Sequence, residues 1–222
     1  MSLDLDRDGA QRYEAVLNEP TLELLCSLAD ANLAKRPGAR LFGAEALRPL
    51  LAPNGLIGAL AAPRLGRAVR AVRAVVFDKS EVNNWAVAWH QDRTIAVEAR
   101  RDVEGFGPWS TKAGVTHVAP PFALLERMLT LRIHLDPCPV DNAPLLIAPG
   151  SHLLGRVAAS EAAGQAERLG SAVCLAGPGD VWVYATPILH ASDRAAQPRR
   201  RRVLQVDFSA DALPGGLAWL GV

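Results

Sequence analysis

The sequence has 222 residues, of which 50% are hydrophobic, and its net charge is only +1. This length allows one large domain or two small ones, and the hydrophobic fraction allows a sizeable core. The near-neutral charge argues against a nucleic-acid-binding surface, and no apolar stretch approaches the roughly 20 residues that a membrane-spanning helix needs.

The first residues of the chain indicate a cytoplasmic protein. They are acidic and lack the apolar segment of a secretory signal peptide. The three cysteines, Cys26, Cys138 and Cys174, are sparse and do not have the spacing of a metal site. An odd, sparse set of cysteines fits a reducing compartment, and we therefore expect the cytoplasm.

The first 65 residues favour helices. Apolar residues recur at helical spacing from Pro20 to Leu33, and the run 35–38 is basic and ends in Pro and Gly, which is typical of a helix end. Shorter helices are predicted over Ala44–Leu51 and Leu56–Leu60. We therefore expect an N-terminal helical layer over residues 1–65.

A strand is predicted over Val69–Phe77, although the arginines in it also allow a helix. The next segment contains His90 and Asp92, two residues apart in a sequence typical of a strand. Residues i and i+2 of a strand point to the same face, so both side chains can converge on one divalent metal ion. With a second histidine they would form the two-histidine, one-carboxylate site of non-haem iron oxygenases. The alternative is an exposed strand edge.

Residues 101–121 are rich in Gly and Pro and are predicted to be a long loop, which is either an active-site lid or a plain surface loop. A short helix follows over Pro121–Met128. The segment Leu129–Asp136 alternates apolar and polar residues like a strand. Its polar face, with Arg132 and His134, either lines a site inside a barrel or faces solvent.

The rest of the chain predicts one helix, over Val157–Leu169, and several short strands separated by Gly/Pro turns. The predicted strands are Leu145–Ala148, Ala172–Leu175, Val181–Tyr184, Ile188–Ser192 and Arg202–Phe208. We therefore expect a mainly β protein with flanking helices, whose core is a cupin-like jelly roll, the double-stranded β-helix. The whole chain, 1–222, is predicted to be a single domain with its jelly-roll catalytic core over 66–210.

His190 is the best candidate for the second histidine ligand. It follows an apolar strand, which should deliver it to the interior, where an imidazole without a partner is costly. Arg201 lies eleven residues later, at the start of the next strand. A guanidinium there could hold the distal carboxylate of 2-oxoglutarate by a bidentate pair. The sequence does not fix which arginine of the run Arg199–Arg202 faces the cavity.

These segments, in this order, resemble the phytanoyl-CoA dioxygenase (PhyH-like) family of Fe(II)/2-oxoglutarate-dependent oxygenases. The matching segments are Trp89-His90-Gln91-Asp92, residues 141–152 ending in Pro149-Gly150-Ser151-His152, Gly179–Tyr184, His190-Ala191-Ser192 and Arg201. The resemblance implies that His90, Asp92 and His190 bind Fe(II). It also implies that Arg201 and Ser192 bind 2-oxoglutarate. Ala143 and Ala195 depart from the family pattern, in which Gly and Asn are frequent at these positions.

The resemblance further implies a dioxygenase that uses O2 to hydroxylate a small molecule, with release of succinate and CO2. The carboxylate of Asp92 favours hydroxylation, because related halogenases lack a carboxylate at this position. We expect Trp109, His117 and Arg132 to contact the substrate, whose identity the sequence does not indicate. Two alternatives remain, a cupin-like metal enzyme that does not use 2-oxoglutarate and a non-catalytic ligand-binding barrel.

Overall fold

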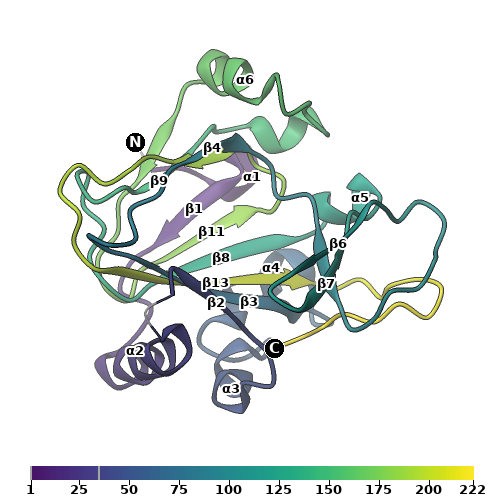
Figure 1. Ribbon diagram of the computed structural model, residues 1–222, viewed down its shortest axis with the longest axis horizontal. Helices are drawn as coiled ribbons and strands as arrows, with labels where there is room; N and C mark the ends of the chain where they lie inside the picture. Colours follow the sequence, from purple (N-terminus) through teal and green to yellow (C-terminus); the bar gives the residue numbers. More distant parts are fainter. Residues whose placement is uncertain (1, 35) are drawn as a thin grey trace.

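The computed structural model describes residues 2–34 and 36–222, which form three antiparallel sheets (Figure 1). The large sheet has the order β1 (Ala10–Tyr13), β11 (Val181–Ala185), β8 (Leu129–His134), β13 (Arg201–Ser209), β3 (Arg70–Lys79), β2 (Gly38–Leu41). The second sheet has the order β10 (Ala172–Cys174), β9 (Leu145–Ile147), β12 (His190–Ser192), β4 (Val87–His90). The third has the order β5 (Ile95–Val97), β7 (Val115–Val118), β6 (Trp109–Lys112). The first two sheets enclose a common cavity, which confirms the predicted jelly roll.

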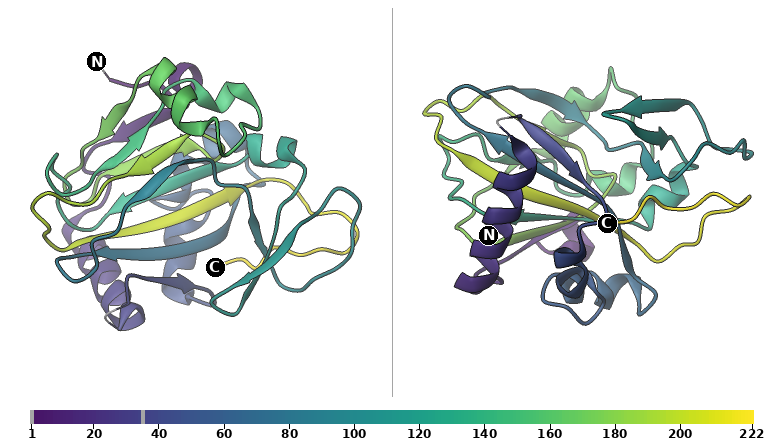
Figure 2. Two further views of the ribbon diagram at one scale, coloured as in Figure 1. Left: turned by 45° about the horizontal axis from the view of Figure 1, so that its top comes forward. Right: turned by 60° about the horizontal axis from the view of Figure 1, so that its bottom comes forward.

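Helices cover the outer face of the large sheet (Figures 1 and 2). The α-helices are α1 (Leu5–Asp8), α2 (Glu19–Leu33), α3 (Arg48–Leu51), α4 (Ala62–Leu65), α5 (Phe122–Glu126) and α6 (Ala162–Leu169). Single 3₁₀ turns are η1 (Glu45–Leu47), η2 (Gly58–Leu60) and η3 (Ser151–Leu154). Within the described ranges, no helix combines the length and the apolar character needed to cross a bilayer.

The longest helix, α2, begins and packs as its sequence indicates. The Asn18 side chain accepts a hydrogen bond from the Thr21 amide at 3.0 Å, and a proline occupies the first turn. Leu25, Ala29 and Leu33 are spaced by four residues, so they lie on one buried face. They pack against the large sheet in the main hydrophobic core. Helix α2 therefore fixes the outer side of the sheet whose inner side forms the cavity.

Strand β8 shows how the large sheet separates a hydrophobic core from a polar interior. Leu129, Leu131 and Ile133 pack in the core on the helix side. The residues between them, among them Arg132 and His134, point to the other face, and all six residues of the strand are buried. The solvent-facing interpretation of His134 was therefore wrong, because the second sheet covers this face.

Three other sequence predictions need correction. The first 65 residues are not only helical, because β1 and β2 pair with β11 and β3 at the two edges of the large sheet. Residues 101–121 are not a loop throughout, because β6 and β7 form a hairpin in this segment. Asp92 is not on a strand, because β4 ends at His90. Near the end of the chain, Trp219 packs against the third sheet, since it lies against Val97 and its indole donates to the Asp211 carbonyl oxygen at 2.8 Å.

Candidate metal centre

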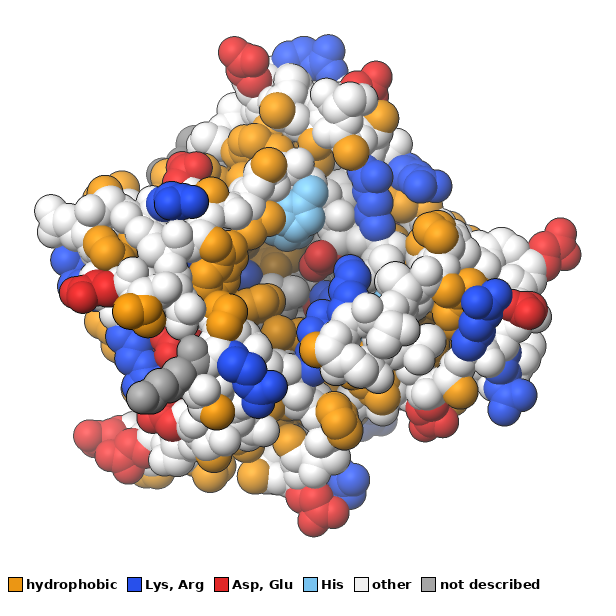
Figure 3. Space-filling view, viewed as in Figure 1, with side chains coloured by type: hydrophobic (Ala, Val, Ile, Leu, Met, Phe, Trp, Pro, Cys, Tyr) orange, Lys and Arg blue, Asp and Glu red, His pale blue; other side chains and the backbone are white. Residues whose placement is uncertain are grey.

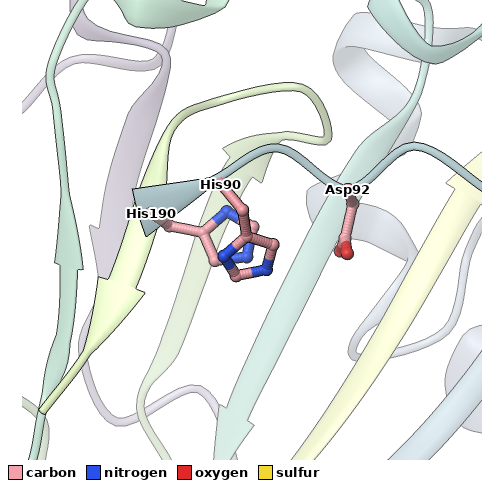
Figure 4. A group of neighbouring side chains, drawn as sticks. All are labelled: His90, Asp92 and His190. Atoms are coloured by element: carbon pink, nitrogen blue, oxygen red, sulfur yellow. The ribbon is translucent and has the colours of Figure 1, made fainter. Parts of the chain in front are cut away.

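The structure brings His90, Asp92 and His190 together at one end of the second sheet (Figure 4). His90 ends β4 and His190 begins β12, and the two residues are direct partners in the antiparallel pairing. Their ring centroids are 4.2 Å apart. Asp92 lies in the coil after β4, and one potential ligand atom from each of the three residues lies within 4.8 Å of the others. Two imidazoles and one carboxylate at this separation can hold one divalent metal ion.

Hydrogen bonds to the backbone orient both imidazoles for metal binding. His90 Nδ1 lies 2.8 Å from the Ala88 carbonyl oxygen, and His190 Nδ1 lies 3.0 Å from the Ile188 carbonyl oxygen. A carbonyl oxygen only accepts, so each Nδ1 donates and each Nε2 keeps a free lone pair. Burial lowers the pKa of His190 to about 4, so this imidazole is neutral at neutral pH. Neutral imidazoles with a fixed tautomer are the form that binds metals.

Arg73, on strand β3, holds the third candidate ligand, Asp92, in place. Its Nη2 lies 3.5 Å from Asp92 Oδ2, and its Nε lies 2.5 Å from Asp207 Oδ2. Burial disfavours a charged Asp92, but Arg73 and the two imidazoles together hold the pKa of this carboxyl below its ordinary value. Asp92 is therefore ionised at neutral pH and can act as an anionic ligand.

The three residues line a cavity of about 270 Å³ between the two larger sheets, which opens as a hollow on the surface in Figure 3. A histidine and an acidic side chain are visible in this hollow, with basic side chains beside them. The floor is the large sheet and the opposite wall is the second sheet. The lining residues, besides the three candidate ligands, are Gly38, Ala39, Arg40, Arg73, Val75, Phe77, Lys79, Trp85, Val87, Arg132, Leu145, Ala191, Ser192, Arg201 and Gln205.

The strand pairing of β13 selects one arginine of the basic run for the cavity. Arg201 pairs with Lys79 and lines the cavity, with a side chain that is 3% exposed. The other three arginines of the run form ion pairs outside the cavity. Arg199 pairs with Asp141, Arg200 with Asp30 and Asp78, and Arg202 with Asp136 and Asp30. Arg201 instead has its Nε buried without a partner, and its Nη1 lies 3.9 Å from Cys138 Sγ. A buried guanidinium in this state is suited to bind an anionic ligand.

Ser192 and Lys79 lie beside Arg201 in the cavity. The Lys79 ammonium donates to the Ser192 hydroxyl at 3.2 Å and to the Asp193 carbonyl oxygen at 2.6 Å. Its Nζ also lies 5.2 Å from the centre of the Trp85 ring. This end of the cavity therefore carries two cations and a hydroxyl, which together favour a carboxylate.

The residues expected to contact the substrate lie in different places. Arg132 lines the cavity, and its Nη1 donates to Gln205 Oε1 at 2.9 Å. Trp109 is half-buried in β6, packed in a hydrophobic cluster at the third sheet, and the Arg100 guanidinium lies 5.5 Å from its ring centre. His117 is fully buried in β7 and donates from Nδ1 to the Val115 carbonyl oxygen at 2.9 Å. Neither Trp109 nor His117 is among the cavity-lining residues.

Sequence reasoning missed Arg40, Arg73 and Lys79. The signal for the last two was present, because Arg73, Val75, Phe77 and Lys79 alternate along β3 with the apolar residues that pack on the helices. Polar residues on the inner face of a buried strand indicate a lined cavity. Arg40 gave no such signal, since β2 has only four residues.

Several solved structures have a similar fold. The epimerase SnoN from nogalamycin biosynthesis is 19% identical, with a TM-score of 0.66, and the match covers 96% of this chain and 85% of SnoN. EctD from S. alaskensis is 17% identical with a TM-score of 0.66, covering 92% of this chain and 74% of EctD. HygX from Streptomyces hygroscopicus is 13% identical with a TM-score of 0.62, and the match covers 92% of this chain and 84% of HygX. SnoN was solved with Fe3+, alpha ketoglutarate and nogalamycin RO, and HygX with nickel and 2-oxoglutarate.

None of the curated proteins matches this sequence. The model of the phytanoyl-CoA dioxygenase (PhyH) family matches residues 7–203, which include all three candidate metal ligands and Arg201. The chain therefore belongs to the phytanoyl-CoA dioxygenase family and is a non-haem iron oxygenase that depends on 2-oxoglutarate.

Proposed function

We propose that this protein hydroxylates a small organic molecule, using Fe(II) held by His90, Asp92 and His190 and 2-oxoglutarate held by Arg201 and Ser192. The observation that carries the proposal is the placement of these two groups in one cavity. The three ligand atoms lie within 4.8 Å of one another, and Arg201 lines the same space. The bound Fe3+ and 2-oxoglutarate in the similarly folded SnoN support the same assignment.

The donor set fits Fe(II). Two imidazole nitrogens and one carboxylate oxygen are the ligands of non-haem iron oxygenases. His90, Asp92 and His190 would therefore hold the metal beside the space that Arg201 lines. Iron and 2-oxoglutarate, when bound, supply the oxidising power for C–H hydroxylation, with succinate and CO2 as the products of 2-oxoglutarate.

The surroundings of Arg201 fit the distal carboxylate of 2-oxoglutarate. A carboxylate there would give the buried guanidinium its missing partner and would accept a further hydrogen bond from the Ser192 hydroxyl. The neighbouring Lys79 adds a second positive charge. A bidentate, charge-assisted pair of this kind fixes both the position and the direction of the bound molecule.

The chain's own residues hold the reacting groups in place. The Asp92 carboxylate would hold the metal where related halogenases have no carboxylate, which would favour hydroxylation. Arg73 holds this carboxylate, and the backbone carbonyls of Ala88 and Ile188 hold the two imidazoles. Apolar side chains such as Val75, Phe77 and Leu145 line the cavity beside these groups.

We propose the reducing cytoplasm as the compartment of this reaction. Cys26, Cys138 and Cys174 are all free thiols, and two of them are buried. Free thiols persist in a reducing compartment, where ferrous iron is also kept reduced.

The proposed function is tested by measuring succinate release from Fe(II)-loaded protein supplied with 2-oxoglutarate, O2 and a panel of small molecules. We expect release in the wild type, and a loss of about 100-fold or more in Asp92→Ala because a metal ligand is removed. Asp102→Ala is the matched control, since Asp102 is an exposed carboxylate outside the cavity. Undiminished release in Asp92→Ala, with circular dichroism showing a folded protein, would rule out the proposed metal site.

A further inference from the structure

The cavity carries more positive charge than its own carboxylate and the proposed cofactors neutralise. Its lining includes five basic side chains, those of Arg40, Arg73, Lys79, Arg132 and Arg201. Asp92 is the one carboxylate among the described lining residues, and Arg73 is paired with it and with Asp207. Fe(II) and the doubly negative 2-oxoglutarate cancel each other, so they leave this excess unchanged. Unpaired cations in a partly buried cavity are unfavourable, and an additional anionic ligand would stabilise them.

Arg40 lies away from the proposed 2-oxoglutarate anchor on the cavity floor. It lies on the edge strand β2, opposite Val75 of β3, and Val75 in turn pairs with Gln205 of β13. Gln205 is four residues along β13 from Arg201, which corresponds to about 13 Å at the usual rise of a strand. One 2-oxoglutarate carboxylate bound at Arg201 would therefore not neutralise Arg40.

The immediate surroundings of Arg40 lack a partner for its charge. Arg40 forms no ion pair within residues 2–34 and 36–222, and its Nε is buried without a hydrogen bond. Burial and the neighbouring Arg73 lower the pKa of Arg40, which means that its charged form is disfavoured there. A guanidinium placed in a cavity without a counter-charge is the arrangement that binds carboxylate or phosphate groups.

Apolar and aromatic side chains line the cavity beyond Arg40. Val75, the pairing partner of Arg40, and then Phe77 follow on β3, and Trp85, whose ring centre lies 5.2 Å from Lys79 Nζ, lines the same cavity. Phe77 and Trp85 also line a second hollow, together with Pro37 and Val82, so the two hollows adjoin. This surface suits an apolar or aromatic body attached to the anionic group.

We propose that the substrate of this oxygenase is a small organic anion, and that Arg40 binds its carboxylate or phosphate group while Phe77 and Trp85 contact its apolar part. The proposal rests on the proposed function, because it assigns Arg201 to 2-oxoglutarate and leaves Arg40 for the substrate. Arg40 is then the residue that selects anionic over neutral substrates.

The test is calorimetric titration of the anaerobic Fe(II)- and 2-oxoglutarate-loaded protein with three probes of one shape. Benzoate carries a carboxylate, phenyl phosphate carries a phosphate, and benzamide is the neutral counterpart of benzoate. Arg40→Met removes the charge, Arg40→Lys keeps it, and Arg67→Met is a matched control because Arg67 is exposed and outside the cavity lining. Saturating 2-oxoglutarate keeps the probes out of the Arg201 site.

We expect benzoate or phenyl phosphate to bind the wild type at least tenfold more tightly than benzamide, and the preferred probe identifies carboxylate or phosphate as the group. Arg40→Met should weaken binding of the preferred anion at least tenfold, Arg40→Lys less, and Arg67→Met not at all. The affinity for 2-oxoglutarate, measured in the same variants, should not change, which also shows that they are folded. Equal binding of benzamide, wild-type anion affinity in Arg40→Met, or no anion binding by the wild type would overturn the proposal.

A failure of the proposed function gives a different result. In that case the wild type would not bind 2-oxoglutarate, and the probes would be titrated into the Fe(II)-loaded protein alone, with Arg201→Met as an additional variant. Loss of anion binding in Arg40→Met but not in Arg201→Met would support the role of Arg40. Loss in Arg201→Met alone would contradict it.

Discussion

Arg73 bridges two carboxylates, one of which is a candidate metal ligand. Its Nη2 lies 3.5 Å from Asp92 Oδ2 while its Nε lies 2.5 Å from Asp207 Oδ2. Asp207 also accepts a hydrogen bond from the Thr130 hydroxyl at 3.0 Å, so the bridge is anchored to the floor of the cavity. Arg73 and Asp207 of the large sheet therefore position Asp92, the candidate ligand that lies in the coil after β4.

Arg73→Met should weaken metal binding, because Asp92 would lose the group that orients it. We expect the affinity for Co(II), followed by its visible absorption, to fall by about 10–100-fold, the usual effect of losing a group that orients a ligand. Arg73→Lys keeps the charge and should retain part of the affinity. Unchanged Co(II) affinity in Arg73→Met would show that Asp92 is positioned without this contact.

The same substitution should also lower the free energy of unfolding. Removing one partner of a buried ion pair leaves uncompensated charge, which typically costs about 3–5 kcal/mol. Here two carboxylates, Asp92 and Asp207, would lose their cation. Urea unfolding of the metal-free protein measures the loss, which should be smaller for Arg73→Lys than for Arg73→Met.

The lowered pKa of Lys79 should make the free energy of unfolding increase as the pH becomes alkaline. Burial, together with nearby Arg201 and Arg132, lowers the pKa of Lys79 to about 8, from 10.5 for an unperturbed lysine. Between these values the folded protein binds fewer protons than the unfolded chain, so the free energy of unfolding rises with pH. The contribution is on the order of 1–3 kcal/mol for a shift of this size in a buried group.

Other groups also titrate in this range, so the comparison must be with Lys79→Met. The difference in unfolding free energy between the wild type and this variant should become more favourable to the wild type from pH 7 to pH 10. Urea unfolding of the metal-free proteins at both pH values provides the measurement. A difference that does not change with pH would mean that Lys79 titrates normally.

Gly9→Ala should destabilise the fold through His152. A Cβ on Gly9 would lie 2.2 Å from His152 Nδ1, and Gly9 also has a positive φ of 77°. Gly150→Ala is the matched control, since Gly150 has the same left-handed conformation, with a φ of 79°, and nothing within 4 Å of its would-be Cβ. We expect Gly9→Ala to cost about 1–3 kcal/mol more than Gly150→Ala, because overpacking adds to the backbone strain. Equal losses in urea unfolding would mean that His152 moves aside freely.

Local patterns in the sequence were sufficient to pick out the candidate metal ligands and most strands after residue 66. His90 and Asp92 are two residues apart and His190 follows an apolar strand, but Asp92 reaches the cluster from the coil after β4 and not from a strand. Which basic side chains face the cavity depends on pairing between strands that are far apart in the sequence. The resemblance pointed to Arg201, but the residues alone did not separate it from Arg199; the register of β13 against β3 and the cavity lining do.

Misleading local signals explain the other differences. The arginines at 67, 70 and 73 are three residues apart, which mimics a helix and concealed the inward position of Arg73. Strand β6 is exposed over most of its length and lies in a segment rich in Gly and Pro, so the hairpin with β7 lacked an apolar alternation. Strands β1 and β2 have four residues each and exist because the large sheet offers them an edge to pair with.

The most direct test of the account is an anaerobic titration of the Fe(II)-loaded protein with 2-oxoglutarate, followed by the visible charge-transfer band of the chelate. We predict a band in the wild type and no band in His190→Ala. Arg201→Met should raise the Kd for 2-oxoglutarate by about 30-fold or more, since losing one partner of a buried charge pair costs about 2 kcal/mol or more. Arg199→Met should leave the Kd unchanged, because Arg199 is paired with Asp141 at the surface. Absence of the band in iron-loaded wild type, or equal Kd values for Arg201→Met and the wild type, would contradict the proposed site.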